Sequence, residues 1–161
     1  MCQLSQTAMA TPSASTDRSP TGDSPAEVTL PSYVPDSDAT PPAAVEAIRE
    51  GLPAEAFDWL KEELDLTTSD LAEVVQISRR TVSRRKKEGR LKPGESERVL
   101  RLIRLYQRAA EVVGGRGEAR KWMQEPNRAL GEASPLQFAD TEPGARRVER
   151  LLGQIEHGVF T

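Results

Sequence analysis

The chain of 161 residues has little of what builds reactive centres: one cysteine, one histidine and 4% aromatic residues. A single cysteine, Cys2, excludes an internal disulfide framework and a metal site made of several cysteines. Cys2 and His157 stand near opposite ends of the chain, and a surface thiol and a surface imidazole are favoured over a catalytic pair, which needs pre-organised partners. Because the chain also lacks a phosphate-binding glycine loop, we expect no catalytic residue, no bound metal and no cofactor.

Long hydrophobic runs are absent as well. No segment approaches the roughly 20 apolar residues that cross a membrane, and the N-terminus has no basic region followed by an apolar stretch. The simplest expectation is a cytoplasmic protein. Hydrophobic residues make up 37% of the chain, below the roughly 45–50% that is usual for a globular domain. Residues 1–40 are rich in Ser, Thr, Pro and Ala and carry a net charge of -4, so they are predicted to form a disordered tail.

The net charge of -3 argues weakly against nucleic acid, but the charge is unevenly distributed. Residues 41–66 carry a net charge of -5, and residues 93–161 a net charge of +1. Between them, residues 67–92 hold eight bases against three acids. The overall acidity therefore hides a concentrated basic segment.

Apolar residues recur at helical spacing and never alternate as in a strand, which predicts an all-α fold. The pattern predicts helices from residue 42 to about 51 and over 53–64, 95–113, 118–125 and 141–155. The first helix would turn Ala44, Val45, Ile48 and Leu52 inward; the second would turn Phe57, Leu60 and Leu64 inward and Glu62, Glu63 and Asp65 outward. The long helix carries a basic stripe of Arg98, Arg101, Arg104 and Arg108 and is a candidate dimerisation surface.

The basic segment has the pattern of a helix-turn-helix. Leu71, Ala72 and Val75 share one helical face, and Val82 recurs where a second helix would pack back on the first. Ser78 is a good N-cap for the second helix, and Thr67 or Thr68 for the first. Residue Thr141 is a plausible N-cap for the last helix.

The outer face of the second helix has the composition of a reader of the DNA major groove, since arginine can bond guanine bidentately and lysine contacts phosphates. The predicted DNA-binding residues are Arg79, Arg80, Thr81, Ser83, Arg84, Lys87 and Arg90. The alternative is a solvated basic helix without a DNA role. Two residues depart from the common pattern: Gln76 stands in the turn where glycine is frequent, and Arg85 stands where an apolar residue is frequent. A DNA-binding protein of this kind is expected to be a homodimer, because two-fold symmetric proteins bind two half-sites.

Several motifs then follow in a characteristic order. They are GLP at 51–53, the segment TVSRRKKEGRLKPGESERVLRLIRLYQRAAEVVGG at 81–115, A-x-x-W at 119–122, PNRALG at 126–131, SPL at 134–136 and DTEPGARRVERLLGQIEHGVF at 140–160. Together they resemble the Xre/ParS/MbcA-type antitoxin family over roughly residues 43–161. The main departure is Glu132, which follows Gly131 where small residues are more usual.

After the predicted disordered tail (1–40), the resemblance implies a helix-turn-helix DNA-binding domain (41–93) and a small helical toxin-binding domain (94–161). It also implies that the partner of this protein is a RES-domain toxin, an enzyme that uses NAD, and that the protein blocks the active site of this toxin. The resemblance further implies that the protein represses its own operon. From the family-like ending we expect these residues to contact the toxin: Arg146, Arg147, Arg150, Glu156, His157, Val159 and Phe160.

Other interpretations remain open at this point. Trp122, Leu136 and Phe138, with Val159 and Phe160, would form an exposed apolar surface for a partner, or Trp122 and Phe138 are simply core. The last five residues would contact the toxin or be a frayed end. The whole chain is either an antitoxin or a stand-alone transcription regulator with a C-terminal dimerisation domain. A neighbouring reading frame for a RES-domain protein would favour the antitoxin.

Overall fold

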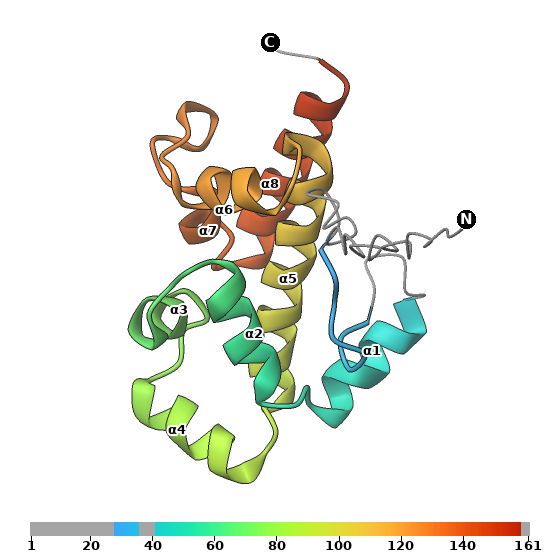
Figure 1. Ribbon diagram of the computed structural model, residues 1–161, viewed down its shortest axis with the longest axis vertical. Coiled ribbons are helices and arrows are strands. Elements are labelled where there is room, and N and C mark those ends of the chain that lie inside the picture. The colour runs from blue at the N-terminus through green and yellow to red at the C-terminus, as the bar shows by residue number, and fades with distance from the viewer. Residues whose placement is uncertain (1–27, 36–40, 159–161) are drawn as a thin grey trace, which may run out of the picture.

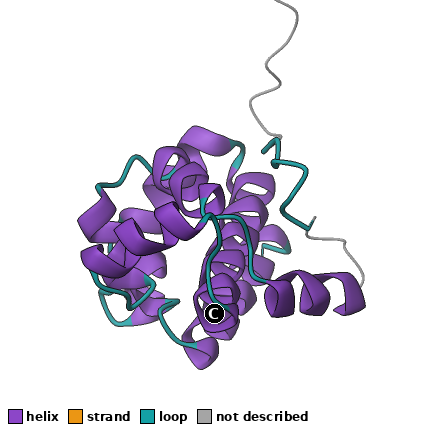
Figure 2. Ribbon diagram, turned by 90° about the horizontal axis from the view of Figure 1, so that it is seen from below, coloured by secondary structure: helices purple, strands orange, loops and turns teal. Residues whose placement is uncertain are grey.

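The computed structural model describes residues 28–35 and 41–158. These residues form helices and no strand beyond two isolated bridge pairs, as Figure 2 shows. The elements are α1 (Pro41–Glu50), α2 (Glu55–Glu63), α3 (Thr68–Val74), α4 (Arg79–Glu88), α5 (Pro93–Val113), α6 (Arg116–Gln124), the 3₁₀-helix η1 (Arg128–Leu130), α7 (Pro135–Phe138) and α8 (Glu142–Glu156). The predicted all-α fold is confirmed.

The long helix α5 is the spine of the molecule (Figure 1). It begins near α4 and contacts α1, α2, α6 and α8. Eleven of its 21 residues are buried, among them Ile103 and Tyr106. Because its apolar face is already covered within the chain, α5 does not offer that face as the dimerisation surface that the sequence suggested. It joins the half made of α2–α4 to the half made of α6–α8.

The helices begin where the sequence predicted N-caps. The side-chain oxygens of Thr67, Ser78 and Thr141 each accept the backbone N–H three residues further on, at 3.2, 3.0 and 3.4 Å. Each cap satisfies one of the N–H groups that a helix start leaves without a partner. These interactions span three residues, which is why the sequence alone predicted the caps at Ser78 and Thr141 and narrowed the third to Thr67 or Thr68.

Some details differ from the sequence prediction. Helix α6 begins at Arg116 rather than at residue 118, and α7 forms where only a turn was expected. Val45 was predicted to face inward, yet it is 42% exposed. Helix α1 packs through the face that carries the buried Ala44, which turns Val45 to solvent. The apolar spacing in this short helix allowed more than one face.

Residues 28–35 differ from the predicted disordered tail. Val34 is 5% exposed, and Val28, Leu30 and Tyr33 pack against the core. Burial, together with the nearby carboxylates of Glu55 and Asp58, raises the pKa of Tyr33, which places this segment beside α2. The remaining residues of the predicted tail, 1–27 and 36–40, lie outside the described residues.

Two glycines of α8 give a test of the packing of this helix. A Cβ at Gly144 would lie 1.7 Å from the carbonyl oxygen of Phe138, whereas a Cβ at Gly153 would meet nothing within 4 Å. We expect Gly144→Ala to destabilise the fold by about 1–3 kcal/mol, because the backbone of Phe138 has to move. Gly153→Ala, the matched control, is expected to stabilise it by roughly 0.5–1 kcal/mol through helix propensity.

Chemical denaturation of both variants measures the difference. Equal free energies of unfolding for Gly144→Ala and Gly153→Ala would contradict the close approach of α8 to the end of α7.

Candidate DNA-binding and toxin-binding surfaces

Helices α3 and α4 form the helix-turn-helix (Figure 1). Leu71, Val75 and Val82 are buried between them and the body of the protein, and Ala72 is 2% exposed. The turn contains Gln76 with a φ of 55°, the left-handed conformation that explains why glycine is frequent at this position. Gln76 therefore stands in place of the frequent glycine, while the backbone of the turn keeps the conformation that glycine would adopt.

The outer face of α4 presents most of the predicted DNA-binding side chains to solvent. Arg79, Arg80, Ser83, Arg84 and Lys87 are all exposed. Of these side chains, Arg84 forms an ion pair within the part of the chain that the structure describes, with its Nε 3.9 Å from Glu88 Oε1. A row of exposed cations along one helix is the arrangement that a major-groove reader requires.

The other two predicted DNA-binding residues make contacts within the chain. Thr81 is half-buried, and its hydroxyl lies 2.9 Å from that of Ser78 in the cap of α4. Arg90 follows α4, and its Nη1 donates to the carbonyl oxygen of Gly51 at 2.8 Å. Their role in DNA contact stays a prediction, and the structure gives each of them a local role as well.

Arg85 is the cation of α4 that the sequence pattern did not explain. Its side chain is 4% exposed. Its Nε and Nη2 donate to the two carboxylate oxygens of Glu95 at 2.7 and 3.0 Å, and its Nη1 donates to Glu88 at 2.6 Å. These hydrogen bonds raise the pKa of Arg85. Arg85, the second residue that departs from the common helix-turn-helix pattern, thus forms a buried ion pair between α4 and α5.

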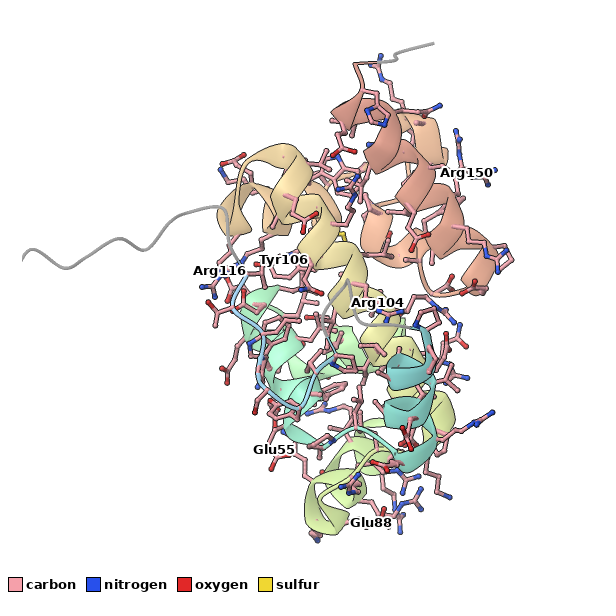
Figure 3. All side chains as sticks on the ribbon, turned by 90° about the vertical axis from the view of Figure 1, so that its right-hand side faces the viewer. Glu55, Glu88, Arg104, Tyr106, Arg116 and Arg150 are labelled. Atoms are coloured by element: carbon pink, nitrogen blue, oxygen red, sulfur yellow. The ribbon has the colours of Figure 1, made fainter. Side chains whose placement is uncertain are left out.

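A second buried carboxylate joins the two halves of the molecule. Glu63 was predicted to face outward, but this was wrong, because it is 7% exposed. It accepts a hydrogen bond from the Tyr106 hydroxyl at 2.9 Å and pairs with Arg116 of α6; Figure 3 shows Tyr106 and Arg116 side by side. Burial, and after it the Glu63 carboxylate, raises the pKa of Tyr106 to about 12.

Helix α6 also caps the end of α2. Arg120 Nε donates to the carbonyl oxygen of Glu63 at 2.7 Å, and Gln124 Nε2 donates to that of Leu64 at 2.6 Å. These donors satisfy carbonyls that the end of a helix leaves free. Since α6 belongs to the C-terminal half, these contacts hold that half against the helix-turn-helix half.

The predicted toxin-binding cations lie on α8. Arg146 pairs with Glu142 at 2.7 Å, with a side chain that is 71% exposed. Arg147 Nη2 donates to the carbonyl oxygen of Ala129 at 3.4 Å, and Arg150 Nε donates to that of Arg146 at 3.3 Å. These bonds leave the exposed ends of the cations at the surface, and Figure 3 shows Arg150 projecting away from the body. Their contact with a toxin stays a prediction.

The remaining predicted toxin contacts are at the end of α8. Glu156 pairs with Arg108 of α5, and Arg101 of α5 lies 3.5 Å from Glu142. The basic stripe of α5 therefore pins α8 near both of its ends. His157 is exposed at the C-cap. Val159 and Phe160 lie outside the described residues.

A surface hollow of about 600 Å³ lies beside α7 and α8. Phe138, Pro143 and Gly144 give it an apolar wall, and Arg147 and Arg150 line it as well. Leu136, expected on an exposed apolar surface, is instead 4% exposed. Trp122 and Phe138 pack against the core and remain partly exposed.

Among residues 28–35 and 41–158, no three His, Cys, Asp or Glu side chains gather closely enough to hold a metal ion. Within the same residues, no helix combines the length and the apolar character needed to cross a membrane.

The fold defines a class: an all-α protein in which a helix-turn-helix is followed by a small helical domain. Residues 43–104 match the family model of the antitoxin Xre-like helix-turn-helix domain. Residues 108–158 match that of the antitoxin Xre/MbcA/ParS C-terminal toxin-binding domain. The chain belongs to the Xre antitoxin family, which is a family of antitoxins and not of enzymes.

Individual relatives agree with this assignment. Antitoxin Xre of Yersinia enterocolitica is 34% identical over 119 residues, which cover 73% of this chain and 80% of that protein. The Prs ADP-ribosylating antitoxin of Sphingobium is 28% identical over 145 residues, covering 75% and 90%. A chain in the crystal structure of the M. tuberculosis MbcT-MbcA toxin-antitoxin complex is 27% identical with a TM-score of 0.50, covering 67% of this chain and 96% of that one.

Proposed function

We propose that this protein neutralises a cognate RES-domain toxin by covering the NAD site of that toxin, and that it represses its own operon by binding DNA through α4. It acts in the cytoplasm as a homodimer on two operator half-sites. Residues 41–93 bind the DNA and residues 94–161 bind the toxin. Helix α5 begins at the boundary and packs against helices of both parts. The match of residues 108–158 to a toxin-binding domain carries this proposal.

One observation supports NAD as the compound that the toxin uses, and a second supports a toxin as the partner. One relative carries ADP-ribosylation in its name, a chemistry in which NAD is the donor, and a structural neighbour comes from a toxin-antitoxin complex. The docking surface is the exposed basic face of α8 with the hollow beside Phe138. Arg147, Arg150 and Asp140 line this hollow together with the apolar Phe138, which suits a partner surface that combines an apolar anchor with charged side chains.

The exposed cations of α4 support operator binding. They lie at one end of the molecule, and Arg150 lies near the other, as the positions of Glu88 and Arg150 in Figure 3 indicate. DNA and toxin therefore have separate surfaces, and the protein holds both at once. The stand-alone regulator is the second candidate, and the toxin-binding domain favours the antitoxin over it.

Co-expression with a RES-domain toxin from the same operon tests the proposed function. We expect the two chains to co-purify through a tag on either one, and we expect the toxin to consume NAD only when it is separated from this chain. A RES-domain toxin from an unrelated operon serves as the control. If the cognate pair does not co-purify, while this chain still binds its operator, the stand-alone regulator is the better description.

A further inference from the structure

The recognition helix α4 is held to the body of the protein by few side chains. Its buried residues are Val82 and Arg85, which are three positions apart and share one face of the helix. Val82 makes an apolar contact, which fixes how close α4 lies to the body of the protein but has no preferred direction. Two polar contacts then set the orientation of the helix about its own axis: the surface pair of Lys86 Nζ with Asp58 Oδ1 of α2 at 2.7 Å, and the pair of Arg85 with Glu95. Of these two, only the Arg85 pair is buried.

The Arg85–Glu95 pair has the geometry that fixes an orientation. The guanidinium meets the carboxylate with two parallel hydrogen bonds of 2.7 and 3.0 Å, and such a fork constrains both the distance and the plane of the two groups. Glu95 in turn accepts the backbone N–H of Lys92 at 2.8 Å, in the first turn of α5. A single carboxylate thus ties the recognition helix to the start of the central helix.

Arg85 is unavailable to DNA in this arrangement. Its Nε and both terminal nitrogens are engaged by Glu95 and Glu88, and its side chain is 4% exposed. The adjacent Arg84 is the opposite case, since its side chain is 59% exposed. Two neighbouring arginines of one helix therefore have different tasks.

We propose that Arg85 is a positioning residue for DNA recognition. It touches no DNA, and through Glu95 it sets the rotation of α4 at which Arg80 and Arg84 meet the major groove. Stability alone does not account for the pair, because a buried ion pair offsets much of its attraction by desolvation. The inference rests on the proposed DNA binding through α4.

The test compares Arg85→Met with Arg84→Met in the full-length chain. Both variants remove one charge, at adjacent positions. The affinity for two duplexes is measured over a range of salt: one from the region upstream of the protein's own reading frame and one of equal length with scrambled sequence. For Arg85→Met we expect the ratio of operator to scrambled affinity to fall at least tenfold, with an unchanged salt slope. For Arg84→Met we expect the ratio to fall as well, because Arg84 reads a base, and we expect the salt slope to decrease, because a cation that meets DNA is lost.

A second variant covers the case in which Arg85→Met does not fold. Arg85→Lys keeps the charge and loses the fork. It is expected to lower the same affinity ratio while the thermal unfolding midpoint shows that the chain is folded. The positioning role would be overturned if folded Arg85 variants kept the operator-to-scrambled affinity ratio of the wild type. A reduced salt slope in Arg85→Met would overturn it as well. If the wild-type protein itself binds the operator and the scrambled duplex equally well, the proposed sequence-specific DNA binding is overturned, and the positioning role with it.

Discussion

Replacing Arg80 and Arg84 together by alanine is expected to abolish sequence-specific binding to the operator while toxin binding stays intact. Both side chains are exposed on the outer face of α4, and arginine contacts to guanine contribute about 1–3 kcal/mol each to discrimination between bases. The loss of both corresponds to a fall in operator affinity of roughly 30-fold or more. The change should leave the fold intact, because Arg84 has only a loose contact with Glu88.

An electrophoretic mobility shift or anisotropy titration measures this loss, and co-purification with the toxin measures the second part. The control is Lys121→Ala with Arg128→Ala, which removes the same charge from exposed positions on α6 and η1. That variant should bind the operator almost as the wild type does. Sequence-specific binding by the Arg80/Arg84 variant would show that α4 is not the recognition helix.

Deleting residues 157–161 is expected to end neutralisation of the toxin without unfolding the antitoxin. Helix α8 ends at Glu156, and its contact with Arg108 survives the deletion. The truncated chain still presents Arg146 and Arg150 on α8. It should therefore still associate with the toxin, while the NAD site of the toxin becomes accessible again.

The measurement is NAD consumption by the toxin in the presence of each antitoxin variant. A chain in which residues 157–161 are replaced by glycine and serine separates the length of the ending from its chemistry, and it should neutralise as poorly as the deletion. Full neutralisation by the truncated protein would remove this ending from the mechanism.

Sequence reasoning succeeded where the signal is local. The caps at Thr67, Ser78 and Thr141 act within three residues, and helical spacing revealed the buried faces of α2 and α3. The order of the motifs was enough to identify the antitoxin family, because each motif is a short continuous stretch of the chain.

It failed where the deciding partner is far away in the chain. Glu63 was predicted to face outward because it lies off the apolar face of α2, yet it meets Tyr106, which is 43 positions away, and Arg116, which is 53 positions away. Val45 and the segment 28–35 failed for a related reason. Which apolar groups are buried depends on the surface that α5 and its neighbours leave open.

By itself, the sequence determined that this protein is helical, which residues cap several of its helices, and that its cations concentrate in a helix-turn-helix. Only the tertiary structure decided which of those cations face solvent. Arg80 and Arg84 remain at the surface, Arg85 is buried against Glu95, and Arg90 holds the carbonyl of Gly51. The reason is physical: charge belongs to a residue, but burial and pairing belong to the packing of helices that are distant in sequence.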